Sequence, residues 1–441
     1  MHFFDVTLTS SQRAILLFAL AALASFIVTL HDAWQYNGVD LRARVVSTRA
    51  FFAGLDAYEV PWQPGQTDRL LDPLRRHPGP GRSFNAPTLF LVYGPTASLP
   101  YPEQRWIWFG IDWLLFLGSA WLLSRVVQND RRAYFAGIVL IGFVIGHSWR
   151  LHVERGQCYT LLTFLISLAL YVRPSDGKGG IALGIAAGLR PSLLIAAPIL
   201  WLLGRRKMSL MMAGTALAMA CVTVAVGGLA TWRSAFLNVD NFRAKTVDPT
   251  FVERSYPAQF ITPRVAEGVD LVSHLDTASF EPTFLQVAVA TSNGWLPLRP
   301  GALLEADKVM AIVGPLLVLA LAASVASRPG ARSGAMLLAL TFALDAEFFL
   351  PSKSAYAELL LLPGLALSME HLSRRRARSA CAAMILGLGL ASAVWLDHAG
   401  DLSVLRGLMI LAMMNVLVVK LVQNREPSES PTRNDVVAPR A

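Results

Sequence analysis

The residues best suited to chemistry are a carboxylate and an arginine that border long apolar segments. Asp40 lies in a polar, aromatic stretch that follows the apolar segment 14–30. A carboxylate held beside a membrane can take a proton from a hydroxyl group and so act as a general base. Asp40 also stands where the N-cap of a following helix is expected. The two roles are compatible, because a capping carboxylate is held rigidly.

Arg190 lies in the middle of the apolar segment 181–203, directly before Pro191. An arginine inside a membrane segment is costly and usually marks function. Its guanidinium can bind a phosphate through two parallel hydrogen bonds. The alternative is an arginine whose aliphatic stem carries its charge to the membrane interface. Lys353 and Tyr356 form a second polar cluster, which either assists in binding substrate and phosphate or is ordinary surface.

Further polar groups lie in the same predicted loops. The stretch 147–157 contains two histidines and a glutamate, but their spacing matches no strong metal-ligand motif. A polar rim that binds sugar hydroxyls is favoured there, and we predict neither a metal nor another cofactor. The segment after Gly54 is also typical of a simple turn. The additional residues predicted to bind substrate are Asp56, Tyr58, Asn85, His152 and Gln157.

The composition of the chain is that of a membrane protein. Of its 441 residues 54% are hydrophobic and only 16% are charged, whereas soluble proteins carry about 25% charged residues. The net charge of +9 comes from arginines and lysines between the apolar segments, which is typical of the positive-inside rule. We therefore expect membrane lipids as surroundings and no nucleic acid as partner. The three cysteines have no paired spacing, so they predict neither a disulfide framework nor a metal site.

The predicted topology depends on the segment 181–203, which has basic clusters at both ends. One straight helix would separate these clusters across the membrane. Two short helices that meet at Arg190-Pro191 would keep both clusters inside, so the broken form is favoured. The other predicted spans are 14–30, 106–127, 133–149, 159–172, 208–230, 303–326, 334–350, 355–369, 380–396 and 405–420.

The resulting fold is an all-α polytopic membrane protein with about twelve membrane segments and its N-terminus inside. Residues 1–422 form a single domain, with two large extracytoplasmic loops at 31–105 and 231–301. Residues 423–441 form a polar cytoplasmic tail whose composition predicts disorder. The absence of any Asn-x-Ser/Thr sequence and the richness in Ala, Arg and Leu favour a bacterial inner membrane.

The first large loop contains a helical pattern next to Asp40. Leu41, Val45, Phe52 and Leu55 recur at helical spacing with arginines between them. This pattern predicts an amphipathic helix, residues 41–52, that lies in the membrane interface and ends at Gly54. Asp345 and Glu347 lie in a late apolar segment and should be paired, although the sequence does not identify their partner.

The order of these motifs resembles that of polyprenyl-phosphate-sugar-dependent glycosyltransferases of the GT-C fold. The closest resemblance is to glycosyltransferase family 87, the polyprenyl-phosphomannose-type mannosyltransferases, over about residues 14–203. The motifs that carry it are the loop Asp40, Gly54-Leu-Asp-Ala-Tyr58, Asn85-Ala-Pro87, Gly156-Gln157 and Arg190-Pro191. Asp40 matches the family's presumed general base, and Arg190-Pro191 matches its Lys-Pro. The family's Ser-Trp and following His are absent from residues 352–358, which leaves the sugar open.

The resemblance implies an inverting membrane glycosyltransferase that needs no cofactor. It implies transfer of a sugar from a polyprenyl-phosphate donor to a glycan or glycolipid acceptor on the extracytoplasmic face. Asp40 would be the base, with Arg190 and Lys353 at the donor phosphate. The main alternative is a polymerase or ligase of the O-antigen type, which uses lipid-diphosphate glycans. A transporter or flippase is disfavoured because paired broken helices are not visible, and a non-enzymatic scaffold is the remaining alternative.

Overall fold

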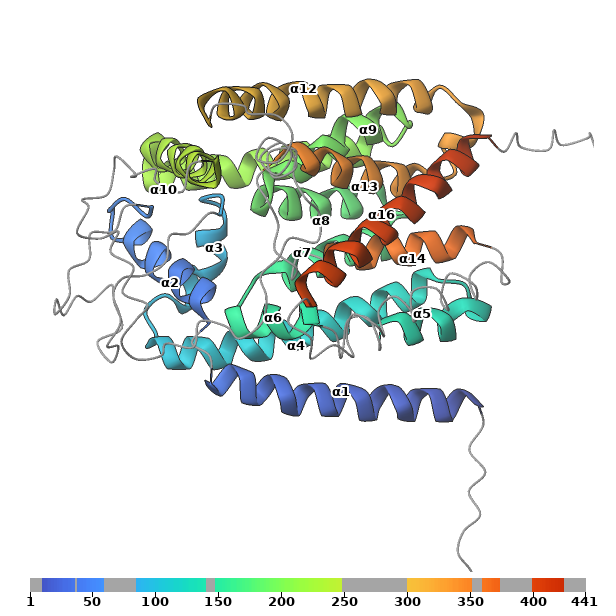
Figure 1. Ribbon diagram of the computed structural model, residues 1–441, viewed down its shortest axis with the longest axis horizontal. Helices are drawn as coiled ribbons and strands as arrows, with labels where there is room; N and C mark the ends of the chain where they lie inside the picture. Colours follow the sequence, from blue (N-terminus) through green and yellow to red (C-terminus); the bar gives the residue numbers. More distant parts are fainter. Residues whose placement is uncertain are drawn as a thin grey trace, which may run out of the picture.

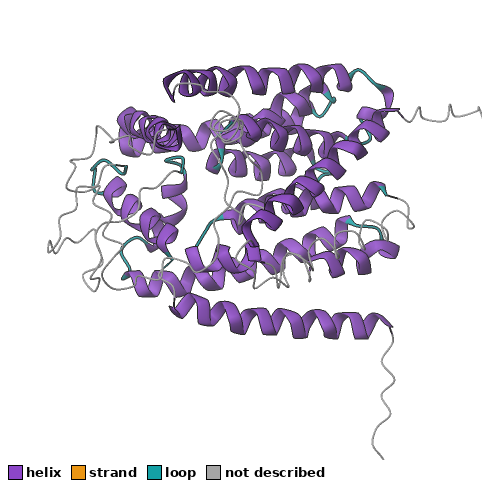
Figure 2. Cartoon of the chain, viewed as in Figure 1, coloured by secondary structure: helices purple, strands orange, loops and turns teal. Residues whose placement is uncertain are grey.

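In the computed structural model, the described residues are 10–35, 38–58, 85–139, 147–247, 300–350, 359–372 and 399–423. Every regular element in these ranges is a helix (Figure 2), as predicted. Lys353, Tyr356, the predicted span 380–396 and residues 424–441 lie outside the described residues.

The helices are labelled in Figure 1. The first half contains α1 (Ser10–Gln35), α2 (Val39–Phe52), α3 (Leu89–Tyr93), α4 (Tyr101–Val126), α5 (Arg132–Ile138), α6 (His147–Arg155), α7 (Tyr159–Tyr171), α8 (Asp176–Leu189) and α9 (Ala196–Leu202). The second half contains α10 (Arg206–Val247), α12 (Pro300–Ala326), α13 (Ala335–Ala346), α14 (Leu361–His371) and α16 (Ala399–Gln423).

Four of these helices are long and apolar enough to cross a membrane, in the windows Phe18–Gln35, Tyr101–Val126, Arg206–Asp240 and Gly301–Ala326. Only 11% of the last window is buried inside the protein. Such an exposed apolar surface on a long helix is what a lipid environment requires. Shorter apolar helical stretches are Tyr159–Tyr171, Pro191–Leu202, Ala335–Ala346 and Leu411–Gln423. The count of twelve segments stays a prediction.

The segment 181–203 is broken at Arg190, as predicted. Helix α8 ends at Leu189, Arg190 has φ −134° and ψ 89°, and a 3₁₀ turn (η4, Pro191–Ile195) leads into α9. After α9, Arg205 Nε donates to Asp176 Oδ1 at 2.8 Å, and Asp176 begins α8. The end of α9 therefore returns to the start of α8, and the two short helices form a hairpin with Arg190 at its tip.

Polar groups gather at the two opposite ends of the bundle. At one end, on the right in Figure 1, Arg173 pairs with Glu370 and Arg131 donates to the carbonyl oxygens of Met369 and Glu370. At the other end lie α2, α3 and α6. Because α8 and α9 form a hairpin, Arg190 belongs to this second end.

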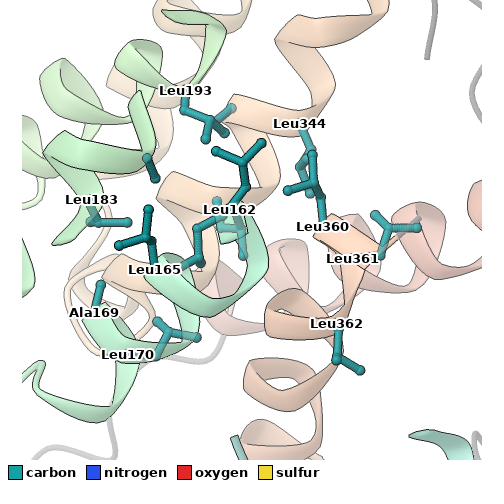
Figure 3. Close-up of a cluster of buried hydrophobic side chains, with 14 of the residues drawn as sticks. Leu162, Leu165, Ala169, Leu170, Leu183, Leu193, Leu344, Leu360, Leu361 and Leu362 are labelled. Atoms are coloured by element: carbon teal, nitrogen blue, oxygen red, sulfur yellow. The ribbon is translucent and has the colours of Figure 1, made fainter. Parts of the chain in front are cut away.

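Between the two ends lies a tightly packed leucine core (Figure 3). Leu162 and Leu165 of α7 meet Leu183 of α8, Leu193 of η4 and Leu344 of α13, and all are at most 8% exposed. Within a membrane such a core is stabilised by van der Waals packing, because lipid tails are as apolar as leucine. This core holds the hairpin against α7 and α13 and so fixes where Arg190 lies.

Two segments that were expected between membrane spans are helical. Residues 231–247, expected in the second loop, continue α10 as a helix beyond a bend at Gly228. Residues 147–155, in the polar stretch 147–157 between two predicted spans, form α6. In α10 polar residues interrupt the apolar pattern without ending the helix, because packed neighbours supply stability that local propensity does not.

The helix predicted at 41–52 is present as α2, and it ends as expected just before Gly54. It does not lie on the surface, however. Leu41, Arg44, Val46 and Thr48 are all at most 3% exposed, although they occupy different sides of the helix. Packing against α3, α6 and the second half of α10 covers α2 on several sides. The prediction of an amphipathic interfacial helix was therefore wrong.

Candidate functional site

Asp40 lies in the first turn of α2, and its carboxylate is bound by two residues from the end of α6 and the turn after it. Arg155 donates from Nε to Oδ2 at 2.5 Å and from Nη2 to Oδ1 at 3.0 Å, and Gln157 Nε2 also donates to Oδ2. The Asp40 side chain is 24% exposed, so it remains reachable. The prediction that Asp40 is the N-cap was wrong, because Gly38 occupies the cap position.

The turn after α6 brings Gln157 to Asp40. The backbone N–H of Gln157 donates to the carbonyl oxygen of His152 at 3.0 Å. Gly156, the residue before Gln157, has φ +64°. This is a Schellman ending, in which glycine takes the left-handed conformation. A Cβ on Gly156 would lie 2.7 Å from Leu41 Cβ. The absence of a side chain here lets α2 approach the turn, which explains the Gly156-Gln157 motif.

A second arginine, Arg44, lies beneath this turn and is only 2% exposed. It donates from Nη2 to Gln157 Oε1, and from Nη1 to Gly156 O at 2.6 Å and Tyr93 Oη at 3.3 Å. Burial acts to lower the Arg44 pKa, but Tyr93, Cys158 and Asp40 outweigh it and the pKa is raised. Arg44 is therefore a permanent positive charge inside the protein.

Arg105 of α4 supports the same turn from the other side. Its Nη2 donates to Val153 O at 2.7 Å and to Glu154 O at 3.2 Å. These carbonyls belong to the last turn of α6, where no partner exists within the helix. Arg105 thus satisfies the end of α6 and ties it to α4.

Arg190, at the tip of the α8–α9 hairpin, forms a buried ion pair. Its Nε donates to Glu347 Oε1 at 2.7 Å and its Nη2 to Glu347 Oε2 at 3.1 Å. Ser192 Oγ donates to the same Oε1 at 2.5 Å, and Arg190 Nη1 donates to Tyr159 Oη at 2.8 Å. The structure thus identifies Arg190 as the partner of Glu347. It also identifies Asn415 as a partner of Asp345, at 3.0 Å.

A cavity of about 100 Å³ lies beside Arg190. Its lining combines polar groups of Asn85, Cys158, Tyr159 and Arg190 with apolar ones of Ala86, Leu89, Leu162, Leu189 and Pro191. Cys158 directly follows Gln157, and its thiol interacts electrostatically with both Arg44 and Arg190. Burial raises the pKa of this thiol. The Asp40 cluster and the Arg190 cavity are therefore neighbouring parts of one region.

Two of the other predicted site residues, Asp56 and Tyr58, form a turn that is joined to a third, Asn85. Asp56 Oδ1 accepts from the backbone amide of Tyr58 at 2.8 Å, which is an Asx turn. Asp56 Oδ2 accepts from Ser234 Oγ at 2.6 Å. Tyr58 Oη donates to the carbonyl of Asn85 at 2.6 Å and so anchors Asn85, which lines the cavity. The turn alternative is confirmed, and the substrate-binding roles stay predictions.

His152 is fully buried and does not line the cavity. Its Nε2 lies 3.4 Å from Asp112 Oδ1, which also accepts from Thr160 Oγ1 at 2.5 Å. These contacts join α6 to α4 and α7. Its predicted role in sugar binding stays a prediction, while its position makes it part of the support for α6.

Arg44 and Arg155 are the residues whose roles sequence reasoning missed. Both are arginines in predicted loops that contain several others. The one signal in the sequence was that Arg155 directly precedes the Gly156-Gln157 motif. Their separation from their partners by 113 and 115 residues explains why no local pattern pointed to them.

Comparison with known proteins connects this site with a family. The family model for glycosyltransferase family 87 matches residues 84–350, which include Asn85, Gln157, Arg190 and Glu347, whereas Asp40 precedes the matched region. No match is found among curated proteins or among solved structures. The matched region covers more than half of the 441 residues. The chain therefore belongs to glycosyltransferase family 87 and is a membrane glycosyltransferase.

Proposed function

We propose that this glycosyltransferase moves a sugar from a polyprenyl-phosphate donor to a hydroxyl group of a glycan or glycolipid acceptor, with inversion, on the extracytoplasmic face. The observation that carries the proposal is the oriented, partly exposed carboxylate of Asp40, which Gln157 binds directly before Cys158, a lining residue of the cavity that also holds Arg190. Asp40 takes the proton of the acceptor hydroxyl as its oxygen attacks the anomeric carbon. The bond to the lipid phosphate breaks, and the phosphate leaves with the electron pair.

The Asp40 carboxylate can accept a further hydrogen bond, as this role requires. In the described part of the chain, Oδ2 accepts two hydrogen bonds and Oδ1 accepts one, from Arg155. Oδ1 therefore keeps a lone pair for the acceptor hydroxyl. Three donors hold the carboxylate in one orientation, which is the property a general base needs for an attack at a defined angle.

Arg190 supports the binding of the leaving phosphate. A guanidinium has five N–H donors, and among the described residues Arg190 uses one each on Nε, Nη1 and Nη2. One N–H on Nη1 and one on Nη2 remain for a phosphate oxygen. Glu347 cancels the charge of Arg190, so the arginine acts through directed hydrogen bonds and a second cation is needed. Lys353 is the candidate for that cation.

The charge distribution supports the extracytoplasmic side. Basic groups gather where α4 ends and α5 begins, between α7 and α8, and where α10 begins, all at the end of the bundle opposite Asp40: Arg125, Arg131, Arg132, Arg173, Lys178, Arg205, Arg206 and Lys207. Basic residues near the ends of spans stay on the cytoplasmic side. The end with Asp40 and Arg190 then faces the other side, where a lipid-linked donor is available and nucleotide sugars are not.

The donor class is the first thing to test. The purified full chain in lipid nanodiscs is given a membrane lipid extract as acceptor and one radiolabelled donor at a time: polyprenyl-phosphate mannose, a polyprenyl-diphosphate glycan, or a nucleotide sugar. The proposal predicts transfer from the monophosphate donor alone. Transfer from the diphosphate glycan alone supports the O-antigen-type alternative, and transfer from the nucleotide sugar contradicts a lipid-linked donor.

A further inference from the structure

The side chain of Gln157 connects two charges of opposite sign. Its Oε1 accepts from Arg44 Nη2, and its Nε2 donates to Asp40 Oδ2. Arginine has no acceptor atom and an ionised carboxylate has no donor. The amide can therefore adopt only one of its two orientations, and Arg44 dictates which one.

Arg44 is well placed to be a rigid support. Its side chain is almost fully buried, and its Nη1 is anchored on Gly156 O and Tyr93 Oη. It thereby joins α2, α3 and the turn after α6. A side chain held at several points loses little entropy in holding a further partner. The orientation of Gln157 thus follows from the fold of three segments.

We infer that Arg44 is a positioning residue of the transfer reaction, which acts through Gln157 on the carboxylate of Asp40. The inference rests on the proposed role of Asp40 as the general base. Gln157 and the Arg155 Nε bind Oδ2 and leave Oδ1 as the atom that accepts the hydroxyl proton. Without Arg44 the amide of Gln157 can turn, and its carbonyl oxygen then faces the carboxylate and repels it.

The surroundings of Asp40 determine how this can be tested by pH. The charged and titratable groups around the cluster are Arg44 on α2, Tyr93 on α3, Arg105 on α4, Glu154 and Arg155 on α6, and Cys158 before α7. Three of these groups are arginines. An additional carboxylate at position 157 would lie against Arg44, so the fold can accept it.

The first test replaces Arg44 with lysine, which keeps the charge and loses the planar fork. With polyprenyl-phosphate mannose as donor, Arg44→Lys lowers the apparent kcat roughly 10- to 100-fold, the loss expected for one hydrogen bond to a charged group. The KM for the donor stays near the wild-type value, because Arg44 does not touch the cavity. A wild-type kcat in Arg44→Lys overturns the inference.

Arg150→Lys is the matched control. Arg150 lies on α6 and pairs bidentately with Asp32 of α1. Its replacement by lysine tests whether kcat falls when any arginine near α6 loses its planar guanidinium group. The inference predicts a smaller effect on kcat than in Arg44→Lys at a comparable or larger fall in Tm. Equal effects on kcat contradict a positioning role that is specific to Arg44.

The second test is Gln157→Glu. The new carboxylate pairs with Arg44 and repels Asp40, so the acid limb of the pH–activity profile moves upward by about one pH unit or more. If the role of Gln157 were purely structural, the substitution would lower the maximal activity and would not shift the acid limb of the pH–activity profile. The double variant Asp40→Asn/Gln157→Glu must be inactive, because activity there would mean that the introduced carboxylate is itself the base.

The outcomes separate the two proposals. If Asp40→Asn is inactive while Gln157→Glu keeps the wild-type acid limb, the inference about Arg44 and Gln157 fails and the proposed function stands. If Asp40→Asn is fully active, the proposed base fails and the inference fails with it. Should Gln157→Glu unfold, the comparison of Arg44→Lys with Arg150→Lys decides the inference alone.

Discussion

Replacing Glu347 with glutamine keeps the size of the side chain and removes the negative charge that faces Arg190. Glu347 is fully buried at its side chain, and the Arg190 side chain is 20% exposed. The amide oxygen can still accept from Arg190 Nε and Ser192 Oγ, but the new amide nitrogen faces the donor Arg190 Nη2. Removing one partner of a buried ion pair costs about 3–5 kcal/mol. Because one acceptor oxygen remains, we expect the lower value, about 3 kcal/mol.

Thermal unfolding of the purified protein in detergent measures this loss. A decrease of about 3 kcal/mol lowers the Tm by a few degrees. The matched control is Glu370→Gln, which breaks the bidentate pair with Arg173 at the opposite end of the bundle. Those side chains are 18% and 33% exposed, and a pair of this kind contributes about 0–1 kcal/mol. Equal falls in Tm for the two variants would refute the reasoning.

A double variant checks the same reasoning from the other direction. In Arg190→Met/Glu347→Leu both charges are replaced by apolar side chains, so no buried charge is left without its partner. Such replacements are often neutral or stabilising. We expect the double variant to unfold at a higher temperature than Glu347→Gln, and to be inactive because Arg190 is absent. A Tm below that of Glu347→Gln would show that the region depends on the charges themselves.

Two further predictions concern the turn that positions Gln157 and the cavity next to it. Gly156→Ala places a side chain at a positive φ, with its Cβ 2.7 Å from Leu41 Cβ. It therefore lowers the Tm more than Gly54→Ala, because Gly54 has a similar φ but open space around it. Equal decreases in Tm contradict this prediction. Cys158 reacts slowly with iodoacetamide at pH 8, because burial raises its pKa and keeps it a thiol, and its reaction rate increases as the pH rises above 9. Polyprenyl-phosphate mannose slows this labelling further by filling the cavity that Cys158 lines, and an unchanged rate would place the donor elsewhere.

The parts of the fold that follow from local chemistry were predictable. Pro191 lacks the backbone N–H of a helix interior and Arg190 precedes it, so the break and the hairpin could be expected from sequence. Gly54 marks the end of α2 for a similar reason. The composition was sufficient to indicate a helical membrane protein.

The parts that depend on distant contacts were not predictable. Glu347 lies 157 residues from Arg190, and Arg155 lies 115 residues from Asp40. No pattern within a single helix carries that information. The misplacement of α2 in the interface has the same origin. Its apolar spacing is that of an amphipathic helix, but neighbouring helices bury Arg44 as well as Leu41.

The central claim is that Asp40 is the base of a glycosyl transfer, and the direct measurement is transfer by Asp40→Asn compared with Asp176→Asn. Both substitutions change an aspartate that pairs with an arginine, at opposite ends of the bundle. With polyprenyl-phosphate mannose as donor, we expect Asp40→Asn to fold, to bind the donor and to lose transfer by at least about 100-fold. Asp176→Asn should transfer at nearly the wild-type rate. Full activity in Asp40→Asn contradicts the account.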